Sequence, residues 1–190
     1  MTNSALTVSE LSLAGVLLLR DKNFRDVRGR FTELWNAERY RLPGAGVFCQ
    51  DNLSVSAKRG TLRGIHFQRG AAAQSKLVRP VCGAVRDVVV DLRPGSTTYL
   101  KWLAVTLSAQ NADALFVPKG FGHAFLTLED ETVVFYKVDT PYRPGEEGAI
   151  RWNDPTLQID WGSELFARTP ILSEKDAAAP LLSEWLERGF

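Results

Sequence analysis

The side chains of this chain best suited to proton transfer centre on a histidine in a strand-like segment. Leu62–Gln68 (LRGIHFQ) places His66, one of two histidines in 190 residues, where apolar and polar residues alternate. Histidine has a free pKa of about 6.5, so it exchanges protons readily near neutral pH. Such a window on its own more often holds a structural histidine, and His66 alone therefore does not define an active site.

Other kinds of catalytic site need residue sets that this sequence does not offer. Metal sites in small β-barrels usually combine three imidazoles with a carboxylate, and this chain has only His66 and His123. Two histidines and one carboxylate stay arithmetically possible, but neither histidine lies in an HxD or HxE pair. The sequence has no GxSxG elbow and no glycine-rich phosphate loop, so a bound phosphate would be held by arginine and lysine side chains.

Length, charge and cysteine content restrict the class of protein. A chain of 190 residues forms one domain with a substantial core, and 23 Lys+Arg against 22 Asp+Glu argue against nucleic acid or an acidic membrane as partner. Cys49 and Cys82 lie in apolar runs without a CxxC pair, which predicts reduced core residues. The apolar run Leu13–Leu19 is too short to span a bilayer and lacks a preceding basic stretch. We therefore expect a soluble, cytoplasmic protein.

Short strands at regular spacing must position the polar residues. The predicted strands cover residues 11–19, 31–35, 47–56, 62–68, 76–82, 85–92, 99–107, 115–117, 123–128 and 133–138, with loops at 21–29 and 140–147. Glycine or proline turns separate them and helical periodicity is nearly absent, which is typical of an all-β sandwich or barrel. Only the C-terminal tail differs, with a helical turn expected at 163–166 and an amphipathic helix at 181–188 that exposes Glu184, Glu187 and Arg188.

Two of these strands have faces of different chemistry. In the segment 47–56, one face carries Val47, Cys49, Leu53 and Val55, and the other carries Gln50, Asn52, Ser54 and Ser56. A solvated face would more often carry Lys, Glu and Thr, so the amides and hydroxyls suggest the wall of a polar pocket. In the segment 85–92, Val88, Val90 and Leu92 face one way and Asp87, Val89 and Asp91 the other.

Nine sequence segments occur in the order and spacing of one enzyme family. They are DxRGxFxE (26–33), QDNxSxS (50–56), LRGIHFQ (62–68), QxKLVR (74–79), DVVVDLR (87–93), PKGFGHAFLTL (118–128), YKVDTPY (136–142), RWNDP (151–155) and LSEKD (172–176). Over about residues 10 to 180 the chain resembles the dTDP-4-dehydrorhamnose 3,5-epimerase family. The resemblance implies a double-stranded β-helix, or cupin-like jelly roll, that forms a homodimer and needs no metal or cofactor. It implies one domain over 1–190, with a core at about 40–145 and a C-terminal extension at about 160–190.

The resemblance also implies the catalytic roles. His66 matches the base that removes protons from C3 and C5 of a 4-keto sugar, whose ketone acidifies both positions. Asp176 matches the carboxylate that fixes the tautomer of His66, and Tyr136 matches the acid on the opposite face of the ring. Lys76 matches the cation beside the C4 oxygen, where negative charge grows as the enolate forms.

A second implied set surrounds the nucleotide. The family pattern places there Arg28, Glu33, Gln50, Asn52, Arg63, His123, Glu147 and Lys175, with Tyr142 stacked on the base. Arginine and lysine suit a diphosphate, whereas amides and a carboxylate suit the edge of thymine. Composition alone would make Arg28, Lys76 and Lys175 ordinary surface charges. Because the family's first strands are exchanged with or packed against the partner subunit, Arg28 and Glu33 are expected in their own site or in the partner's.

The implied reaction is epimerisation of dTDP-4-dehydro-6-deoxy-D-glucose at C3 and C5 to dTDP-4-dehydro-L-rhamnose, in deoxysugar synthesis for lipopolysaccharide or antibiotics. The chain departs from the family where GFGHAF stands for GFAHGF, where Arg30 replaces an aromatic, and where Ala71–Ala73 replace a proline pair. These departures remove no polar catalytic residue but leave the exact sugar and nucleotide open. The alternatives are a C3-only or C5-only epimerase of another dTDP- or GDP-linked 4-keto sugar, and a non-catalytic sugar-nucleotide-binding cupin. A 3,4-ketoisomerase would be expected to lack the LSEKD carboxylate.

Overall fold

The computed structural model describes residues 6–163 and 169–188, and in this part of the chain strands form two facing sheets and a separate hairpin. One sheet has the order β1-β2-β10-β7-β12-β5, formed by Thr7–Glu10, Leu17–Arg20, Ala114–Val117, Lys76–Cys82, Thr132–Val138 and Gln50–Ser56. The other has the order β13-β6-β11-β8-β9, formed by Glu147–Ala149, Leu62–Gln68, Phe121–Thr127, Ala84–Asp91 and Trp102–Ser108. Neighbouring strands run antiparallel, which confirms the all-β prediction.

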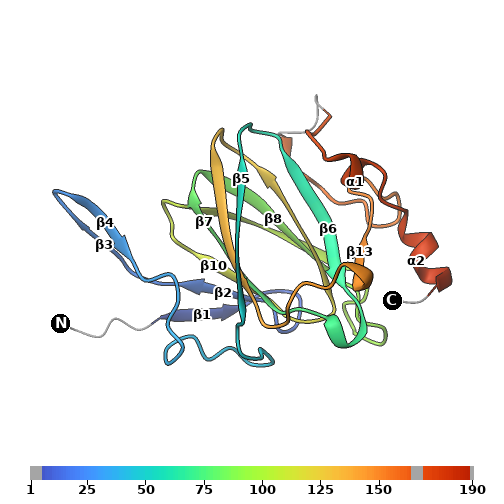
Figure 1. The fold of residues 1–190 in the computed structure, drawn as a ribbon, viewed down its shortest axis with the longest axis horizontal. Helices are drawn as coiled ribbons and strands as arrows, with labels where there is room; N and C mark the ends of the chain where they lie inside the picture. Colours follow the sequence, from blue (N-terminus) through green and yellow to red (C-terminus); the bar gives the residue numbers. More distant parts are fainter. Residues whose placement is uncertain (1–5, 164–168, 189–190) are drawn as a thin grey trace.

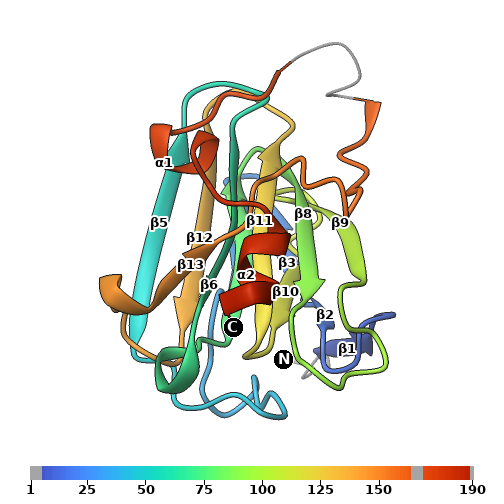
Figure 2. The same cartoon turned by 90° about the vertical axis from the view of Figure 1, so that its right-hand side faces the viewer.

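The hairpin and the helices lie outside the two sheets. Strands β3 (Asn23–Asp26) and β4 (Gly29–Thr32) form a hairpin that projects from one side of the molecule (Figure 1). Short 3-10 turns cover Gly70–Ala72 and Pro144–Glu146. Helix α2 (Leu182–Arg188) lies on the side of the five-stranded sheet that faces away from the other sheet (Figure 2), whereas helix α1 (Glu174–Ala177) lies against β6.

Most predicted strands are confirmed to within three residues at either end, but the first strand is wrong and one predicted loop contains a strand. The segment predicted as one strand over 11–19 begins with the turn that separates β1 from β2, and only its end, from Leu17 onward, is strand. The segment 21–29, predicted as a loop, contains β3 and the turn that joins β3 to β4. Its many charged residues hid the strand pairing from the sequence pattern. The C-terminal helix is confirmed at Leu182–Arg188, whereas the helical turn expected at 163–166 falls largely outside the described residues.

Three apolar clusters hold the sheets together. The inner cluster fills the space between the sheets and includes Val78, Val89, Leu107, Leu115 and Val134. A second cluster packs the C-terminal segments against the outer face of the five-stranded sheet and includes Val88, Val90, Leu92, Trp161 and Trp185. The sequence predicted that Val89 faces away from Val88, Val90 and Leu92. This prediction is correct, because Val89 lies in the inner cluster and the other three lie in the second cluster.

The third cluster packs the segment 35–48 against the outer face of the six-stranded sheet, through residues such as Leu17, Leu77 and Tyr40. Cys49 and Cys82 lie outside all three clusters. Both are free and exposed, so the prediction that they belong to the core is wrong. Cys49 immediately precedes β5 and Cys82 ends β7, where the strands leave the packed layers.

Candidate active site

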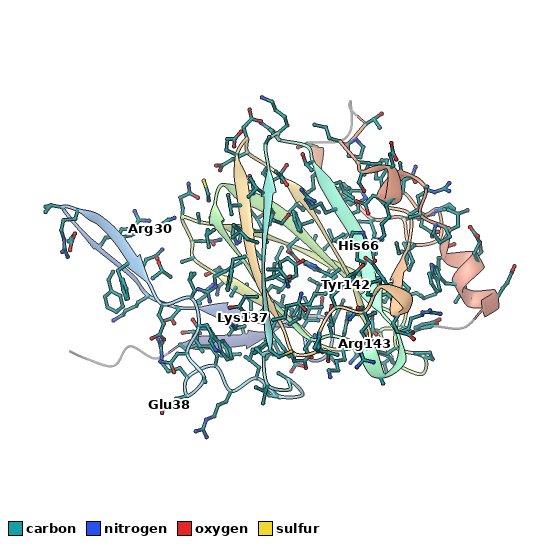
Figure 3. All side chains as sticks on the ribbon, viewed as in Figure 1. Arg30, Glu38, His66, Lys137, Tyr142 and Arg143 are labelled. Atoms are coloured by element: carbon teal, nitrogen blue, oxygen red, sulfur yellow. The ribbon has the colours of Figure 1, made fainter. Side chains whose placement is uncertain are left out.

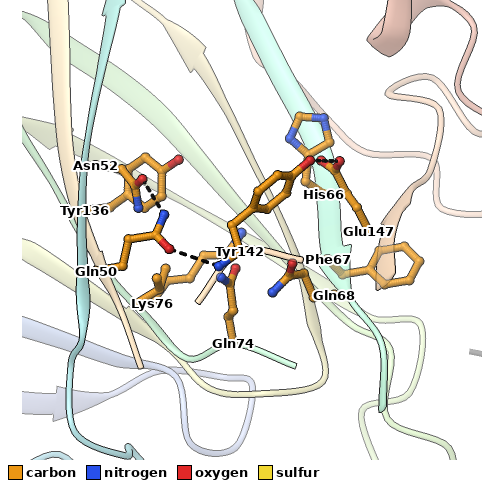
Figure 4. Close-up of a pocket in the computed structure, with 11 residues that line it drawn as sticks. Gln50, Asn52, His66, Phe67, Gln68, Gln74, Lys76, Tyr136, Tyr142 and Glu147 are labelled. Carbon is orange, nitrogen blue, oxygen red and sulfur yellow. Dashed lines mark hydrogen bonds between the residues drawn. The ribbon is translucent and has the colours of Figure 1, made fainter. Parts of the chain in front are cut away.

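The polar residues of the two sheets meet in a pair of adjoining cavities between the sheets. Their volumes are about 290 Å³ and 230 Å³, and both are lined by His66, Lys76 and Tyr136. His66 comes from β6 in the five-stranded sheet, whereas Lys76 and Tyr136 come from β7 and β12 in the six-stranded sheet. The histidine and the tyrosine therefore stand on opposite walls of one pocket (Figure 4).

His66 is paired with a carboxylate from the C-terminal end of the chain. Its Nε2 lies 2.5 Å from Oδ1 of Asp176, which is buried on α1. Ser173 caps this helix by accepting the Asp176 N–H, and its hydroxyl donates to Asp176 Oδ2 at 3.0 Å. Burial opposes ionisation of Asp176, but its hydrogen bonds with His66 and Ser173 outweigh burial and hold its pKa below the usual value. A carboxylate on Nε2 leaves Nδ1 of His66 as the basic nitrogen.

The second histidine lies directly beside the first. His123 on β11 is the cross-strand partner of His66, and its Nε2 lies 2.9 and 3.0 Å from the two carboxylate oxygens of Asp87 on β8. The strands approach closely here because Gly64 has no side chain. A Cβ at Gly64, whose φ is +126°, would lie 2.4 Å from the Cβ of Ala124. The fold thus places two His–Asp pairs side by side.

Burial changes the proton affinity of both groups on the opposite wall. Burial lowers the pKa of Lys76 to about 8, although the negative charges of Asp87 and Glu147 oppose this shift. Burial also raises the pKa of the Tyr136 phenol, which the positive charge of Arg63 partly offsets. At neutral pH the pocket therefore holds a protonated lysine and a neutral tyrosine that can donate its proton.

The predicted nucleotide contacts Gln50, Asn52, Tyr142 and Glu147 line the larger cavity (Figure 4). The face of β5 that carries Gln50 and Asn52 is therefore a pocket wall, as its amides suggested. Tyr142 donates its hydroxyl to Glu147 at 2.6 Å, and Glu147 also accepts from Lys175. Burial opposes ionisation of Glu147, but its hydrogen bonds from Lys175 and Tyr142 hold its pKa below the usual value.

Three other residues predicted to contact the nucleotide do not line the larger cavity. Arg63 lines the smaller cavity and donates to the Val55 carbonyl at 3.0 Å. Arg28 and Glu33 line neither cavity, since Arg28 pairs with Asp26 on the projecting hairpin and Glu33 pairs with Arg39. Figure 3 shows the separation, with Arg30 of this hairpin far from His66 and Tyr142.

The structure also brings in residues that were not predicted. The cavities are further lined by Gln68, Gln74, Ser54, Ser173, Phe67, Phe125 and Val138. Alternation along β5 pointed to Ser54, and Gln68 and Gln74 stand at the edges of quoted motifs. Asp87 likewise begins the motif DVVVDLR, but nothing in the sequence pairs it with His123.

Two structural features are absent from the described residues. No group of three or more His, Cys, Asp or Glu side chains in residues 6–163 and 169–188 is arranged to hold a metal ion. No helix in the same residues is long and apolar enough to cross a membrane.

Known proteins match this chain closely in sequence and structure. The sequence profile of the dTDP-4-dehydrorhamnose 3,5-epimerase family matches residues 10–184. The Salmonella typhimurium dTDP-4-dehydrorhamnose 3,5-epimerase is 46% identical over 183 residues, covering 95% of this chain and 98% of the relative.

Solved structures give the same result. The Bacillus anthracis dTDP-4-dehydrorhamnose 3,5-epimerase with TDP and PPi bound has a TM-score of 0.87 at 44% identity, covering 94% of this chain and 100% of that chain. ChmJ, a 3'-monoepimerase from Streptomyces bikiniensis in complex with dTDP-quinovose, has a TM-score of 0.86 at 35% identity, covering 94% and 89% of the two chains. The profile, the relatives and the fold agree, and the chain belongs to the dTDP-4-dehydrorhamnose 3,5-epimerase family.

Proposed function

We propose that this protein is an isomerase that inverts C3 and C5 of dTDP-4-dehydro-6-deoxy-D-glucose, giving dTDP-4-dehydro-L-rhamnose through enolate intermediates. The observation that carries the proposal is the placement of His66 and Tyr136 on opposite walls of one pocket. Inversion at carbon requires that a proton leave from one face of the sugar ring and return to the other. A base and an acid on facing sheets meet that requirement without movement of either sheet.

His66 is the proposed base, and Asp176 is its positioning partner. The contact of Asp176 with Nε2 keeps the imidazole in the tautomer whose Nδ1 is free to accept a proton. The same carboxylate stabilises the imidazolium that forms when the C3 or C5 proton is taken. Because Asp176 is buried and ionised, its charge acts on His66 through little intervening water.

Lys76 and Tyr136 complete the proposed mechanism from the other wall. As the base removes a proton, negative charge moves to the C4 oxygen, where the protonated amine of Lys76 stabilises the enolate. The neutral hydroxyl of Tyr136 then donates a proton to the opposite face of the same carbon. Each centre inverts in one such cycle, so no metal or cofactor is required by this scheme.

The dTDP group is proposed to bind toward the mouth of the pocket. Arg63, His123 and Lys175 supply donors or positive charge for the diphosphate, Gln50 and Asn52 supply amides for the base edge, and Glu147 and Tyr142 lie at the rim. Tyr142 is 47% exposed, which leaves its ring surface accessible for stacking on the base.

We also propose a homodimer in which Arg28 and Glu33 serve the partner's pocket. The hairpin exposes Phe24 and Phe31, and β5, an edge strand, exposes Leu53 and Val55 at 63% and 54%. Exposed apolar side chains gathered on one strand face mark an interaction surface. Free Cys49 and Cys82 suit a reducing compartment, so we place the dimer in the cytoplasm.

Mixing two inactive variants tests this dimer. His66→Ala subunits and Arg28→Ala subunits are combined under conditions of subunit exchange. If Arg28 acts in the partner's pocket, each mixed dimer contains one site with neither defect, and activity returns. If both residues act in the same subunit, no intact site forms and the mixture stays inactive.

Turnover in heavy water tests the reaction itself, with deuterium followed by NMR. The wild-type protein is expected to give the L-configured 4-keto sugar with deuterium at both C3 and C5. Tyr136→Phe is expected to form enolates that are reprotonated without inversion, so that deuterium enters with retained configuration. Full inversion by Tyr136→Phe at the wild-type rate would remove Tyr136 from the mechanism. Absence of label in the wild type would favour a sugar-nucleotide-binding protein.

A C3-only epimerase is the second candidate, because the 3'-monoepimerase ChmJ shares this fold. Deuterium at C3 alone would select it over the double epimerase. Thermal shifts with dTDP, UDP and GDP decide the nucleotide, since a ligand at about 100 times its Kd stabilises the folded state by about 2.7 kcal/mol. A shift with GDP alone would contradict the dTDP assignment while leaving epimerisation possible.

A further inference from the structure

The connection between β12 and β13, residues 139–146, crosses the mouth of the pocket. It leaves the six-stranded sheet after Val138 and enters the five-stranded sheet at Glu147, and it carries Tyr142. Residues 141–146 are exposed. The backbone of an exposed connection usually bonds to water, and such segments are mobile unless something fastens them.

Three pocket-lining glutamines from three separate segments fasten this connection by its backbone. Gln50 on β5 accepts the N–H of Tyr142 at 2.9 Å. Gln68 at the end of β6 accepts the N–H of Arg143 at 2.6 Å. Gln74, just before β7, donates to the carbonyl of Thr140 at 2.7 Å. We call Gln50, Gln68 and Gln74 the glutamine clasp.

The clasp residues are built into the pocket wall. Gln68 is buried, and its amide nitrogen donates to the carbonyl of Ala72 at 2.8 Å, so both ends of its amide are engaged. A neutral amide can accept at one end and donate at the other, which a carboxylate or an ammonium group cannot do. The clasp therefore fixes the backbone without adding charge next to Lys76.

Fixing residues 140–143 also fixes the direction of the Tyr142 ring. The backbone on either side of Tyr142 is bonded, and the hydroxyl at the far end of the ring donates to Glu147 (Figure 4). A side chain held at both ends has lost its conformational entropy before a ligand arrives. Binding to such a side chain costs less than binding to a mobile one.

We propose that Gln68 and Gln74, together with Gln50, are positioning residues that hold Tyr142 across the pocket mouth in the orientation that stacks on a nucleoside base. The inference rests on the proposed function for the stacking role, but the clasp itself is a property of the ligand-free protein. It assigns a role to Gln68 and Gln74 through Tyr142, and neither acts on the reacting carbons.

The test uses Gln74→Met, which removes the donor to Thr140 while keeping the length and neutrality of the side chain. Gln110→Met is the matched control, because Gln110 is an exposed glutamine in the turn after β9. In the ligand-free protein, amide hydrogen exchange at Tyr142 and Arg143 is expected to be about tenfold faster in Gln74→Met, and unchanged in Gln110→Met. Gln68→Met, which removes the acceptor for Arg143, is the second variant.

Calorimetry with dTDP then tests positioning against a general loss of structure. Tyr142→Ala is expected to weaken dTDP binding about tenfold, as for loss of one base-stacking ring, and Gln74→Met about fivefold. Because Gln74 acts through Tyr142, the double variant is expected to bind no more weakly than Tyr142→Ala alone. In turnover, Gln74→Met is expected to raise KM and leave kcat unchanged.

The possible results distinguish a failure of the glutamine clasp from a failure of the proposed function. Normal dTDP binding with unchanged exchange in both glutamine variants would overturn the clasp. Fully additive losses in the double variant would overturn the positioning of Tyr142. A wild-type protein that does not bind dTDP would overturn the proposed function and the stacking role with it, while faster exchange in Gln74→Met would still establish the clasp.

Discussion

The two His–Asp pairs of the pocket use the same residue types and lie side by side, yet their environments differ. The side chain of His66 is 29% exposed to the cavity, and its Asp176 comes from a helix 110 residues further along the chain. The side chain of His123 is 8% exposed, and Asp87 comes from the strand next to it in the same sheet. Proton exchange with a substrate requires access, so the difference in exposure supports the proposal that His66 is the base and His123 a fixed donor.

The largest expected loss of activity comes from replacing His66, the more exposed of the two histidines. His66→Ala is expected to lower kcat by about 10⁴-fold, because a positioned general base contributes up to about that factor. His123→Asn keeps a donor at the neighbouring position and is expected to raise KM about tenfold with a smaller change in kcat. Steady-state kinetics on both variants check this. Equal losses of kcat would show that the two pairs are not functionally distinct.

Asp176→Asn is expected to have the next largest effect, a loss of about 10³-fold in kcat, because an amide does not fix the tautomer or stabilise the imidazolium of His66. Binding of dTDP is expected to be unchanged, since Asp176 acts on the tautomer and charge of His66 and is not one of the proposed dTDP contacts. Calorimetry with dTDP is the control. A parallel loss of binding would indicate that Asp176 is structural.

Lys76 lines both cavities and makes the pocket sensitive to pH. Its pKa of about 8 means that the amine loses its proton as pH rises through 8, and the enolate then lacks its cation. The value of kcat/KM, which reports on the free enzyme, is expected to fall about tenfold per pH unit above pH 8. Lys76→Arg is expected to remove this alkaline decline because guanidinium stays protonated. A decline at the same pH in Lys76→Arg would assign it to another group.

Replacing Asp87, the partner of His123, is expected to change activity through the pKa of Lys76. Burial lowers the pKa of Lys76, and the charge of Asp87 opposes that shift, so its removal is expected to move the alkaline decline of kcat/KM to lower pH. At pH 7 the loss of activity is expected to be about tenfold or less. The exposed Asp160 provides the control variant Asp160→Asn, which is expected to leave the profile unchanged. An unchanged profile in Asp87→Asn would mean that Asp87 acts on His123 alone.

The smallest expected effect concerns metal. Because the proposed mechanism assigns enolate stabilisation to Lys76, exhaustive chelation with EDTA is expected to leave kcat and KM unchanged. Elemental analysis of the protein before and after chelation provides the control. Loss of turnover that one divalent metal restores would overturn the role of Lys76 and would place a metal between the two histidines.

The amino-acid sequence determined the strands and the chemistry of their faces. Alternation located β6 and β7 at the residues observed, and it identified the amide face of β5 as a pocket wall. Motif order supplied the family and the set of polar residues. These properties are local, because side chains two residues apart share a face of any strand.

Only the tertiary structure decided what each face meets. Leu53 and Val55 lie on the apolar face predicted for the segment 47–56, yet the structure leaves both exposed on β5, at the edge of the six-stranded sheet. The register of β6 and β11 set His66 opposite His123, and helix α1 brought Asp176 to His66 across 110 residues. The hydrogen bonds that join Gln68 and Gln74 to residues 140–143 could not be predicted from the sequence either. Contacts between distant segments follow from how the sheets pack, and a one-dimensional pattern does not encode that packing.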